Sequence, residues 1–141
     1  MVKWFSARDA DTPVILDLGY LQRLTKHIGQ RETQELLADG MLDLTDRLDR
    51  LRHFGQEGDV KAVASLAHEI AGAAGHQGLT AMAHAAFDVA RLVREKPNTQ
   101  ASDLAALILT WQDPSIEALA EYCSQPIMQE QPDRSKSGKS G

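Results

Sequence analysis

The sequence predicts an all-α protein: an up-and-down antiparallel four-helix bundle with an additional N-terminal segment or helix and a proline-interrupted C-terminal helix. Three observations predict this fold. No proline occurs between Pro13 and Pro97, and residues that favour helices dominate that span. Apolar residues recur within it at intervals of three and four, the period of a helix that buries one face. Short links containing glycine separate these stretches, which favours antiparallel neighbours.

The N-terminal segment, residues 1–13, turns polar after Trp4 and Phe5 and therefore lacks the apolar core of a signal peptide. The two aromatic residues either cover an end of the bundle or belong to a frayed tail, and simple packing is the favoured interpretation. A first helix then begins at Asp17, which can cap it, and stops at Gly29. Its apolar face consists of Leu18, Leu21, Leu24 and Ile28.

The second helix carries the clearest bundle seam, with apolar residues at spacings of 4, 3, 4 and 3. Gly40 weakens this helix locally and allows a bend, and we expect the turn that follows at Gly55 to Gly58. The seam consists of Leu37, Met41, Leu44, Leu48 and Leu51. The charged residues on the other faces predict a solvated surface: Asp39, Asp43, Asp46, Arg47, Asp49, Arg50 and Arg52.

Asp59 is expected to cap a third helix that ends near Gly75, followed by a link at residues 76–78. Such a short link forces the third and fourth helices to lie antiparallel. In the fourth helix we interpret Met82 and Phe87 as packing residues. The inward residues of the third helix are Val60, Val63, Leu66, Ala67, Ile70 and Ala74, and those of the fourth are Leu79, Met82, Ala86, Val89 and Val93.

The segment 96–98 closes the fourth helix, and Ser102 with Asp103 can open a last one. Pro114 must kink or stop that helix because proline removes a backbone donor, and we expect it to resume over residues 115–123. This helix carries Leu104, Leu107, Ile108 and Trp111. The domain therefore spans residues 14–124, and the polar segment 125–141, rich in Gly, Ser and Pro, is predicted to be a disordered tail.

Composition excludes several classes of function. A net charge of −5 and a pI near 5.5 argue against a nucleic-acid partner. The single cysteine, Cys123, excludes an internal disulfide framework, and we assign it no role. The longest stretch without a charged residue, 70–87, contains glycines and two histidines, which argues against a membrane span. We expect a cytoplasmic protein, and the acidic, mixed-charge surface favours a monomer.

His68 is the residue around which the site prediction is built. At about 100° per residue, Leu66 and Ile70 lie on the opposite side of the helix, so His68 should point to solvent. All but one of the residues that share its face are small, which is unusual for a solvated helix face. They are Lys61, Ala64, Ser65, Ala71, Gly72 and Gly75. Small residues around one titratable side chain indicate that another molecule approaches closely.

Three other interpretations of this stretch compete with a close-approach site. An exposed histidine on an alanine-rich helix needs no function. A zinc site of the H-E-x-x-H type is excluded because Gly72 stands where the second ligand is needed. A DNA-binding helix-turn-helix is disfavoured because the candidate recognition segment, residues 80–89, contains no Arg or Lys for phosphate contacts.

The run His68, Ile70, Gly72, Gly78 and Leu79 resembles the histidine-containing phosphotransfer (HPt) domain, whose pattern is H-x-L-K-G-x-x-x-x-x-G followed by an apolar residue. The resemblance covers about residues 14–95. It implies a helical bundle that acts as a phosphorelay intermediate of two-component signal transduction, with His68 accepting and donating the phosphoryl group. The implied partners are receiver domains of response regulators, a hybrid sensor histidine kinase, or both.

The same resemblance implies that the chain has no kinase centre, metal site or cofactor of its own, because the receiver domain brings Mg²⁺. An exposed imidazole is largely unprotonated at neutral pH and available as a nucleophile. Gly72 and Gly75 would let the receiver's loops reach it. The predicted supporting or docking face consists of Lys61, Ala64, Ser65, Ala71, Gly72, Gly75 and Gly78.

One departure from the family pattern leaves two functions open. The family usually has Lys or Arg three residues after the histidine, where this chain has Ala71. Lys61 lies on the same face but about 10 Å along the helix axis, so it substitutes only in part. We favour active phosphotransfer because His68, Gly72 and Gly78 are all present. The alternative is an HPt-like adaptor that binds signalling partners without accepting phosphate. His27, His53, His76 and His84 are weaker candidates for the acceptor.

Overall fold

The computed structural model describes residues 14–126. The predicted N-terminal segment with Trp4 and Phe5, and residues 127–141 of the predicted tail, lie outside the described residues. Within residues 14–126 the chain forms helices and no strand, which confirms the all-α prediction. The helices are α1 (Leu18–Ile28), α2 (Gln30–Glu57), α3 (Val60–His76), α4 (Thr80–Glu95), α5 (Ala101–Leu109) and α6 (Gln112–Cys123).

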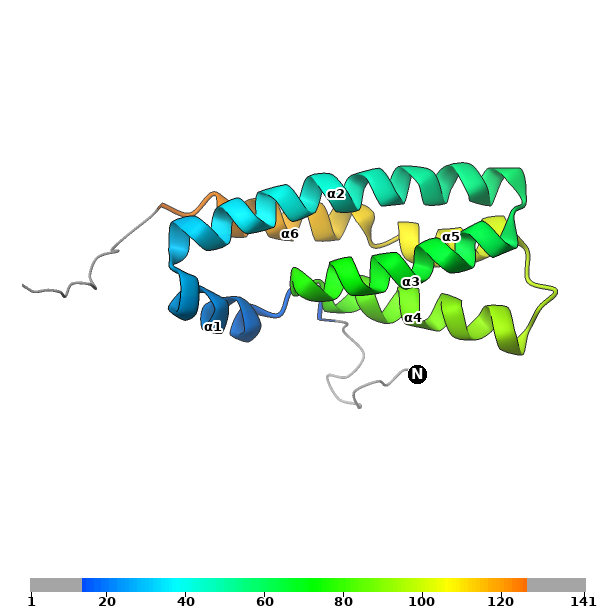
Figure 1. Cartoon of the computed structure of the whole chain (residues 1–141), viewed down its shortest axis with the longest axis horizontal. Helices are drawn as coiled ribbons and strands as arrows, with labels where there is room; N and C mark the ends of the chain where they lie inside the picture. Colours follow the sequence, from blue (N-terminus) through cyan, green and yellow to red (C-terminus); the bar gives the residue numbers. More distant parts are fainter. Residues whose placement is uncertain (1–13, 127–141) are drawn as a thin grey trace, which may run out of the picture.

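These helices form an antiparallel bundle in which α5 and α6 together take the fourth position (Figure 1). The long α2 runs the full length of the bundle, and α5 and α6 follow one another along it. The shorter α3 and α4 lie side by side in opposite directions. The predicted four-helix bundle with an added N-terminal helix and a broken C-terminal helix is therefore confirmed.

The short α1 is tied to the link between α3 and α4. The Asp17 backbone N–H donates to the Gly78 carbonyl at 2.8 Å, and the Tyr20 hydroxyl donates to the His76 carbonyl at 2.9 Å. Leu21, on the same helix, is fully buried. These contacts fix the end of α3 that lies beyond His68, so α1 helps to position the site.

Both predicted caps are present. The Asp17 carboxylate accepts from the Tyr20 N–H at 3.0 Å, and the Asp59 carboxylate accepts from the Ala62 N–H at 3.0 Å. Each satisfies one of the backbone donors that a helix leaves unpaired at its start. The cap at Asp59 fixes where α3 begins.

Two glycines of α2 have roles that the sequence did not reveal. The helix continues through Gly55, which the turn prediction had included, and ends at Gly58. A Cβ at Gly55 would lie 2.8 Å from the Ala105 Cβ, so this glycine permits close contact with α5. A Cβ at Gly40 would lie 2.9 Å from the Gln77 Cδ, so Gly40 makes room for that buried side chain within an uninterrupted α2.

The break in the C-terminal helix falls at Thr110 and Trp111, earlier than the predicted position at Pro114. Pro114 lies in the first turn of α6, where a backbone N–H has no intrahelical acceptor and its loss costs little. The interruption was predicted, but proline begins the second helix instead of ending the first. Of the apolar residues predicted for this helix, Leu107 is 45% exposed.

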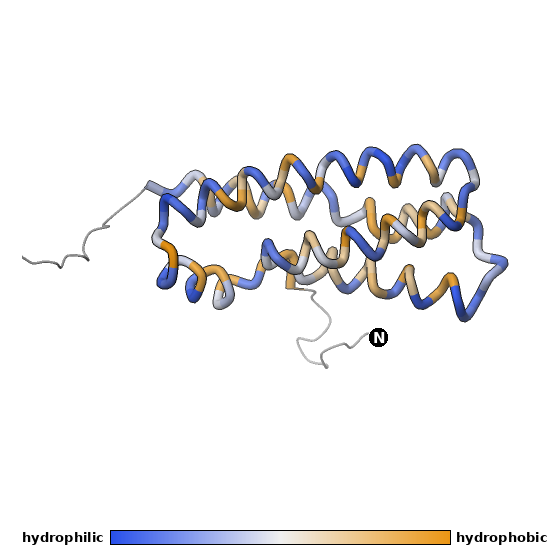
Figure 2. The backbone as a smooth tube through the Cα atoms, in the orientation of Figure 1, coloured by the Kyte–Doolittle hydropathy of each residue, from blue (hydrophilic) through white to orange (hydrophobic). Residues whose placement is uncertain are grey.

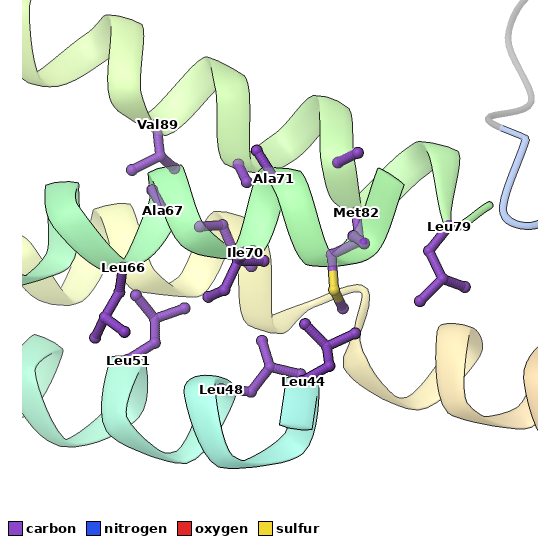
Figure 3. Close-up of a cluster of buried hydrophobic side chains, with 14 of the residues drawn as sticks. Leu44, Leu48, Leu51, Leu66, Ala67, Ile70, Ala71, Leu79, Met82 and Val89 are labelled. Carbon is purple, nitrogen blue, oxygen red and sulfur yellow. The ribbon is translucent and has the colours of Figure 1, made fainter. Parts of the chain in front are cut away.

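The core runs along the bundle axis, where apolar residues of all four positions meet (Figure 2). Leucines of α2 face Leu66 and Ile70 of α3, while Ala67 faces Val89 of α4 and Ala71 points toward α4 (Figure 3). Alanines on both helices let α3 and α4 pack closely, since the distance between packed helices depends on the side chains between them. These are Ala67, Ala71 and Ala74 on α3 and Ala83 and Ala86 on α4.

No helix in the described part of the chain is both long and apolar enough to span a membrane.

Candidate functional site

His68 lies near the middle of α3 with its side chain exposed, as the helical phase predicts. Leu66 and Ile70, its neighbours two residues away on either side, are 5% and 0% exposed and fix the rotation of the helix. Burying these two side chains on the core side leaves the imidazole pointing outward. The ring is therefore accessible to another molecule.

The surface beside His68 is low and open toward the end of α3. Gly72 and Gly75 are both exposed, and a Cβ at either position would meet nothing within 4 Å. On the other side of His68, Lys61 and Ser65 are exposed and Ala64 is half-buried. Five of the seven residues predicted to support the site thus lie on the accessible face around the histidine.

Ala71 does not lie on that accessible face. It is 4% exposed and packs in the core cluster toward α4 (Figure 3). Ser65, equally far around the helix from His68 in the opposite sense, is exposed. The difference arises because α4 lies closely against the Ala71 side of α3. The predicted position of Ala71 on the docking surface is therefore wrong, although the residue borders it from below.

Gly78 is also absent from the docking surface. It is buried in the link between α3 and α4, with a φ of +74° that favours glycine. A Cβ there would lie 3.2 Å from the Tyr20 Cδ2 and 3.5 Å from the Asp17 carbonyl oxygen. Gly78 shapes the link and lets α1 pack on it, so of the predicted supporting or docking roles its position fits support of the site.

The role of Gly78 can be tested by comparing Gly78→Ala with Gly58→Ala. Both glycines have left-handed backbones, with φ of +74° and +76°, but a Cβ at Gly58 would meet nothing within 4 Å. We expect Gly58→Ala to lower the free energy of unfolding by about 1 kcal/mol. Gly78→Ala should lower it further because Tyr20 must also move. Denaturant unfolding measures both, and equal losses would contradict packing of Tyr20 against this link.

An ion-pair network borders His68 on the α2 side. The Arg47 Nε donates to the Glu69 Oε1 at 3.1 Å, and the Arg47 guanidinium also pairs with Asp43. Burial lowers the pKa of Arg47, but its bonds with both carboxylates outweigh this and raise it. The sequence pattern predicts Asp43 and Arg47 only as part of a solvated face. Their spacing of four residues predicts their own pairing, whereas the contact with Glu69 depends on how α2 and α3 pack.

A cavity of about 380 Å³ lies beyond the network, between α1, α2 and the end of α3. Tyr20, Leu36, Gly40, Ala73 and His76 contribute to its walls. In residues 14–126, no three or more His, Cys, Asp and Glu side chains form a group that could hold a metal ion. Among the described residues near α3, the exposed imidazole of His68 is therefore the side chain on which the candidate site is built.

A comparison with protein families decides what kind of domain this is. The family model described as the Hpt domain matches residues 20–125, which include nearly all of α1 and the whole of α2 to α6. The chain belongs to the Hpt domain family. Searches of curated proteins and of solved structures gave no match. The match extends beyond the stretch that carries the resemblance and takes in α5 and α6.

Membership places this Hpt domain in two-component phosphorelay signalling, in which Hpt domains interact with receiver domains and kinases. Membership also identifies position 71 as the place where this chain lacks the family's usual Lys or Arg. In this Hpt domain, the residue three after His68 is an alanine under α4. Lys61 shares the helix face of His68, and Arg47 on α2 is engaged by two carboxylates, Asp43 and Glu69.

On the α4 side the Hpt domain exposes an aromatic ring. Phe87, interpreted from the sequence as a packing residue, is 57% exposed, whereas Met82 is 1% exposed as predicted. Phe87 and Met82 lie five residues apart and thus about 140° apart around α4. Since Met82 faces the core, Phe87 faces the outer surface.

The other histidines and the cysteine occupy less suitable positions. His76 and His84 are exposed, but neither fits the family motif. His27 and His53 lie on other helices, near the ends of α1 and α2, and neither fits the family motif. Cys123 is half-buried, and burial raises the pKa of its thiol, which disfavours the reactive thiolate.

Proposed function

We propose that this Hpt domain is a phosphorelay intermediate that carries a phosphoryl group on His68 between the aspartates of receiver domains. The donor and acceptor would be receiver domains of response regulators, of a hybrid sensor histidine kinase, or of both. The observation that carries this proposal is the exposed imidazole of His68 beside two exposed glycines, Gly72 and Gly75. Membership in the Hpt family supports it.

The proposed reaction is a direct transfer between an aspartyl phosphate and the imidazole. A lone pair on one ring nitrogen attacks phosphorus, and a nitrogen–phosphorus bond forms as the bond from phosphorus to the aspartate oxygen breaks. The carboxylate leaves with that electron pair, and the proton on the other ring nitrogen stays in place. The reverse step passes the phosphoryl group to the next aspartate.

The residues of this chain would contribute mostly geometry. Phosphoryl transfer depends on positioning and on neutralising the charge of the moving group. The capped and packed α3 holds the imidazole at a fixed place, and the two glycines leave room for the loops that surround the receiver's aspartate. We propose that Mg²⁺, bound by the receiver, supplies charge neutralisation and that this chain needs no cofactor of its own.

A second candidate function is favoured by one observation, the alanine at position 71. A chain without the family's cation could bind receiver domains as an adaptor and accept no phosphoryl group. Its buried position means that Ala71 contributes packing between α3 and α4 in either case. Only a measurement of transfer separates the two functions.

The test is to incubate the full chain with a set of receiver domains phosphorylated on aspartate, in the presence of Mg²⁺. Transfer to the chain is followed on a gel that retains phosphate. The proposal predicts a label on this chain that is stable in base and lost in acid, the behaviour of a phosphohistidine. Absence of label from every receiver, with the chain shown to be folded by circular dichroism, would favour the adaptor.

A further inference from the structure

A strip of alanines separates His68 from the exposed ring of Phe87. Ala64 and Ala71 lie on the side of α3 that is turned toward α4, the first half-buried and the second buried. Ala83 is buried and Ala90 half-buried, and they lie four residues before and three residues after Phe87 on α4. Residues at these spacings share one face of a helix. The outer surface between the two helices is therefore apolar and low.

Phe87 lies level with the histidine along the bundle. In an antiparallel pair joined by a short link, residues equally far from the link lie opposite one another. Ala67 and Val89 show this directly, since they face each other across the pair (Figure 3). Phe87 is two residues nearer the link than Val89 and is thus level with Glu69, the residue after His68.

The direction in which Phe87 points follows from the handedness of the helix. With Met82, Ala86 and Val89 facing the core, the right-handed turn of a helix antiparallel to α3 places Ala83, Ala90 and Phe87 toward the surface that carries His68. The position of Arg47 on α2 provides a check. The same rule, applied to α2, turns Arg47 toward α3, where it pairs with Glu69. His68 therefore has an ion pair on one side and Phe87 on the other.

Any protein that delivers a phosphoryl group to His68 must cover this surface. A specific protein interface buries about 800 Å² on each partner, and packed helix axes lie about 8–10 Å apart. A footprint of that size centred on His68 extends from α3 onto α4 and takes in Phe87. An exposed aromatic residue within such a footprint is the kind of side chain that contributes most to binding.

We propose that Phe87 is the anchor by which a receiver domain docks, inserting into an apolar depression beside the receiver's phosphorylated aspartate. This inference rests on the proposed function and identifies the chemistry of the partner's surface. The alanine strip lets the receiver approach closely, and the Asp88–Arg91 pair, 3.2 Å apart, lies on the polar rim of α4. Phe87 would thus help to determine which receivers reach His68.

The test compares Phe87→Asp with a matched control, Leu42→Asp. Leu42 is also a large exposed apolar residue, at 75%, but lies on the outer face of α2, about 200° around the helix from the buried Leu44. Two phosphoryl donors are used: a phosphorylated receiver domain, which must dock, and phosphoramidate, a small donor that needs no docking surface. Rates are measured over a range of receiver concentrations.

We expect Phe87→Asp to lower kcat/KM for the receiver by about tenfold or more, mainly by raising KM, as for loss of an interface anchor. Leu42→Asp should stay within about twofold of wild type, because surface changes outside an interface have small effects. Labelling of His68 by phosphoramidate should be the same in wild type and both variants. Phe87→Leu should recover most of the lost transfer.

Several results would overturn the inference. Equal transfer by Phe87→Asp and Leu42→Asp would show that receivers do not use Phe87. Slower labelling of Phe87→Asp by phosphoramidate would place the effect on His68 itself. A wild-type dimer in sedimentation that Phe87→Asp converts to a monomer would assign the surface to a second copy of this chain.

Failure of the proposed function gives a different result. In that case no receiver labels the wild type, although phosphoramidate does. Receiver binding is then measured by calorimetry, and loss of binding in Phe87→Asp but not in Leu42→Asp would still support the docking anchor. Equal binding by the two variants would overturn it.

Discussion

Replacement of His68 by Gln is expected to abolish phosphoryl transfer from every receiver domain that labels the wild type. A glutamine amide has no nucleophilic lone pair comparable to that of the imidazole, so no nitrogen–phosphorus bond can form at this position. Because His68 is exposed, the free energy of unfolding should change by no more than about 0.5 kcal/mol. Transfer is followed on a phosphate-retaining gel, and stability by urea unfolding.

Two other exposed histidines supply matched controls. His76→Gln and His84→Gln remove an imidazole from α3 and α4 and should leave the label at its wild-type level. His76 holds Tyr20 through its backbone carbonyl, which the substitution keeps. An acid-labile label that persists in His68→Gln and disappears in His84→Gln would contradict our proposal, because it would show that the acceptor is His84 on α4.

The fold was predictable because its periodicity is strong. The seam of α2 and the inward residues of α3 recur at three and four residues, and the cores they predict are the ones found, including Leu44, Leu48 and Ile70. The caps at Asp17 and Asp59 are local, since each carboxylate bonds a backbone N–H three residues away. Local hydrogen bonds and helical phase can be read directly from sequence.

Errors arose where a residue's environment depends on a neighbouring helix. Ala71 and Ser65 lie equally far around α3 from His68, so the sequence gives no reason to separate them, yet only Ala71 is buried. The close approach of α4, through alanines on both helices, covers one side of α3 more than the other. A helical wheel contains the angle of each residue but not the positions of adjacent helices.

Glycines show the same limitation. Gly40, Gly55 and Gly78 contact Gln77, Ala105 and Tyr20, residues far away in the sequence, and each makes room for its partner. From sequence alone they were assigned a bend, a turn and a supporting or docking face. Gly72 and Gly75, by contrast, have open space where a side chain would be. No packing contact requires glycine at either position, which directs attention to an approaching partner.

Gly72 provides the second prediction with a large expected effect. Gly72→Gln places a side chain one turn from His68, on the surface that a receiver must cover, so transfer from a receiver should fall by about a hundredfold. Gly72→Ala is the matched control. Its Cβ meets nothing within 4 Å, and alanine favours a helix by about 1 kcal/mol over glycine, so the variant should be more stable and still transfer.

The two variants separate helix stability from access to His68. Glutamine also favours a helix over glycine, so Gly72→Gln should unfold at a higher urea concentration than wild type while it transfers poorly. Phosphoramidate, which is small, should label His68 in both variants at the wild-type rate. If Gly72→Gln accepts phosphate from a receiver as fast as Gly72→Ala does, the receiver approaches His68 from another side, and the open surface along Gly72 and Gly75 is not the route of docking. A slow Gly72→Gln that phosphoramidate labels normally would show that the bare helix beside His68 serves the approach of a partner rather than the chemistry of the imidazole.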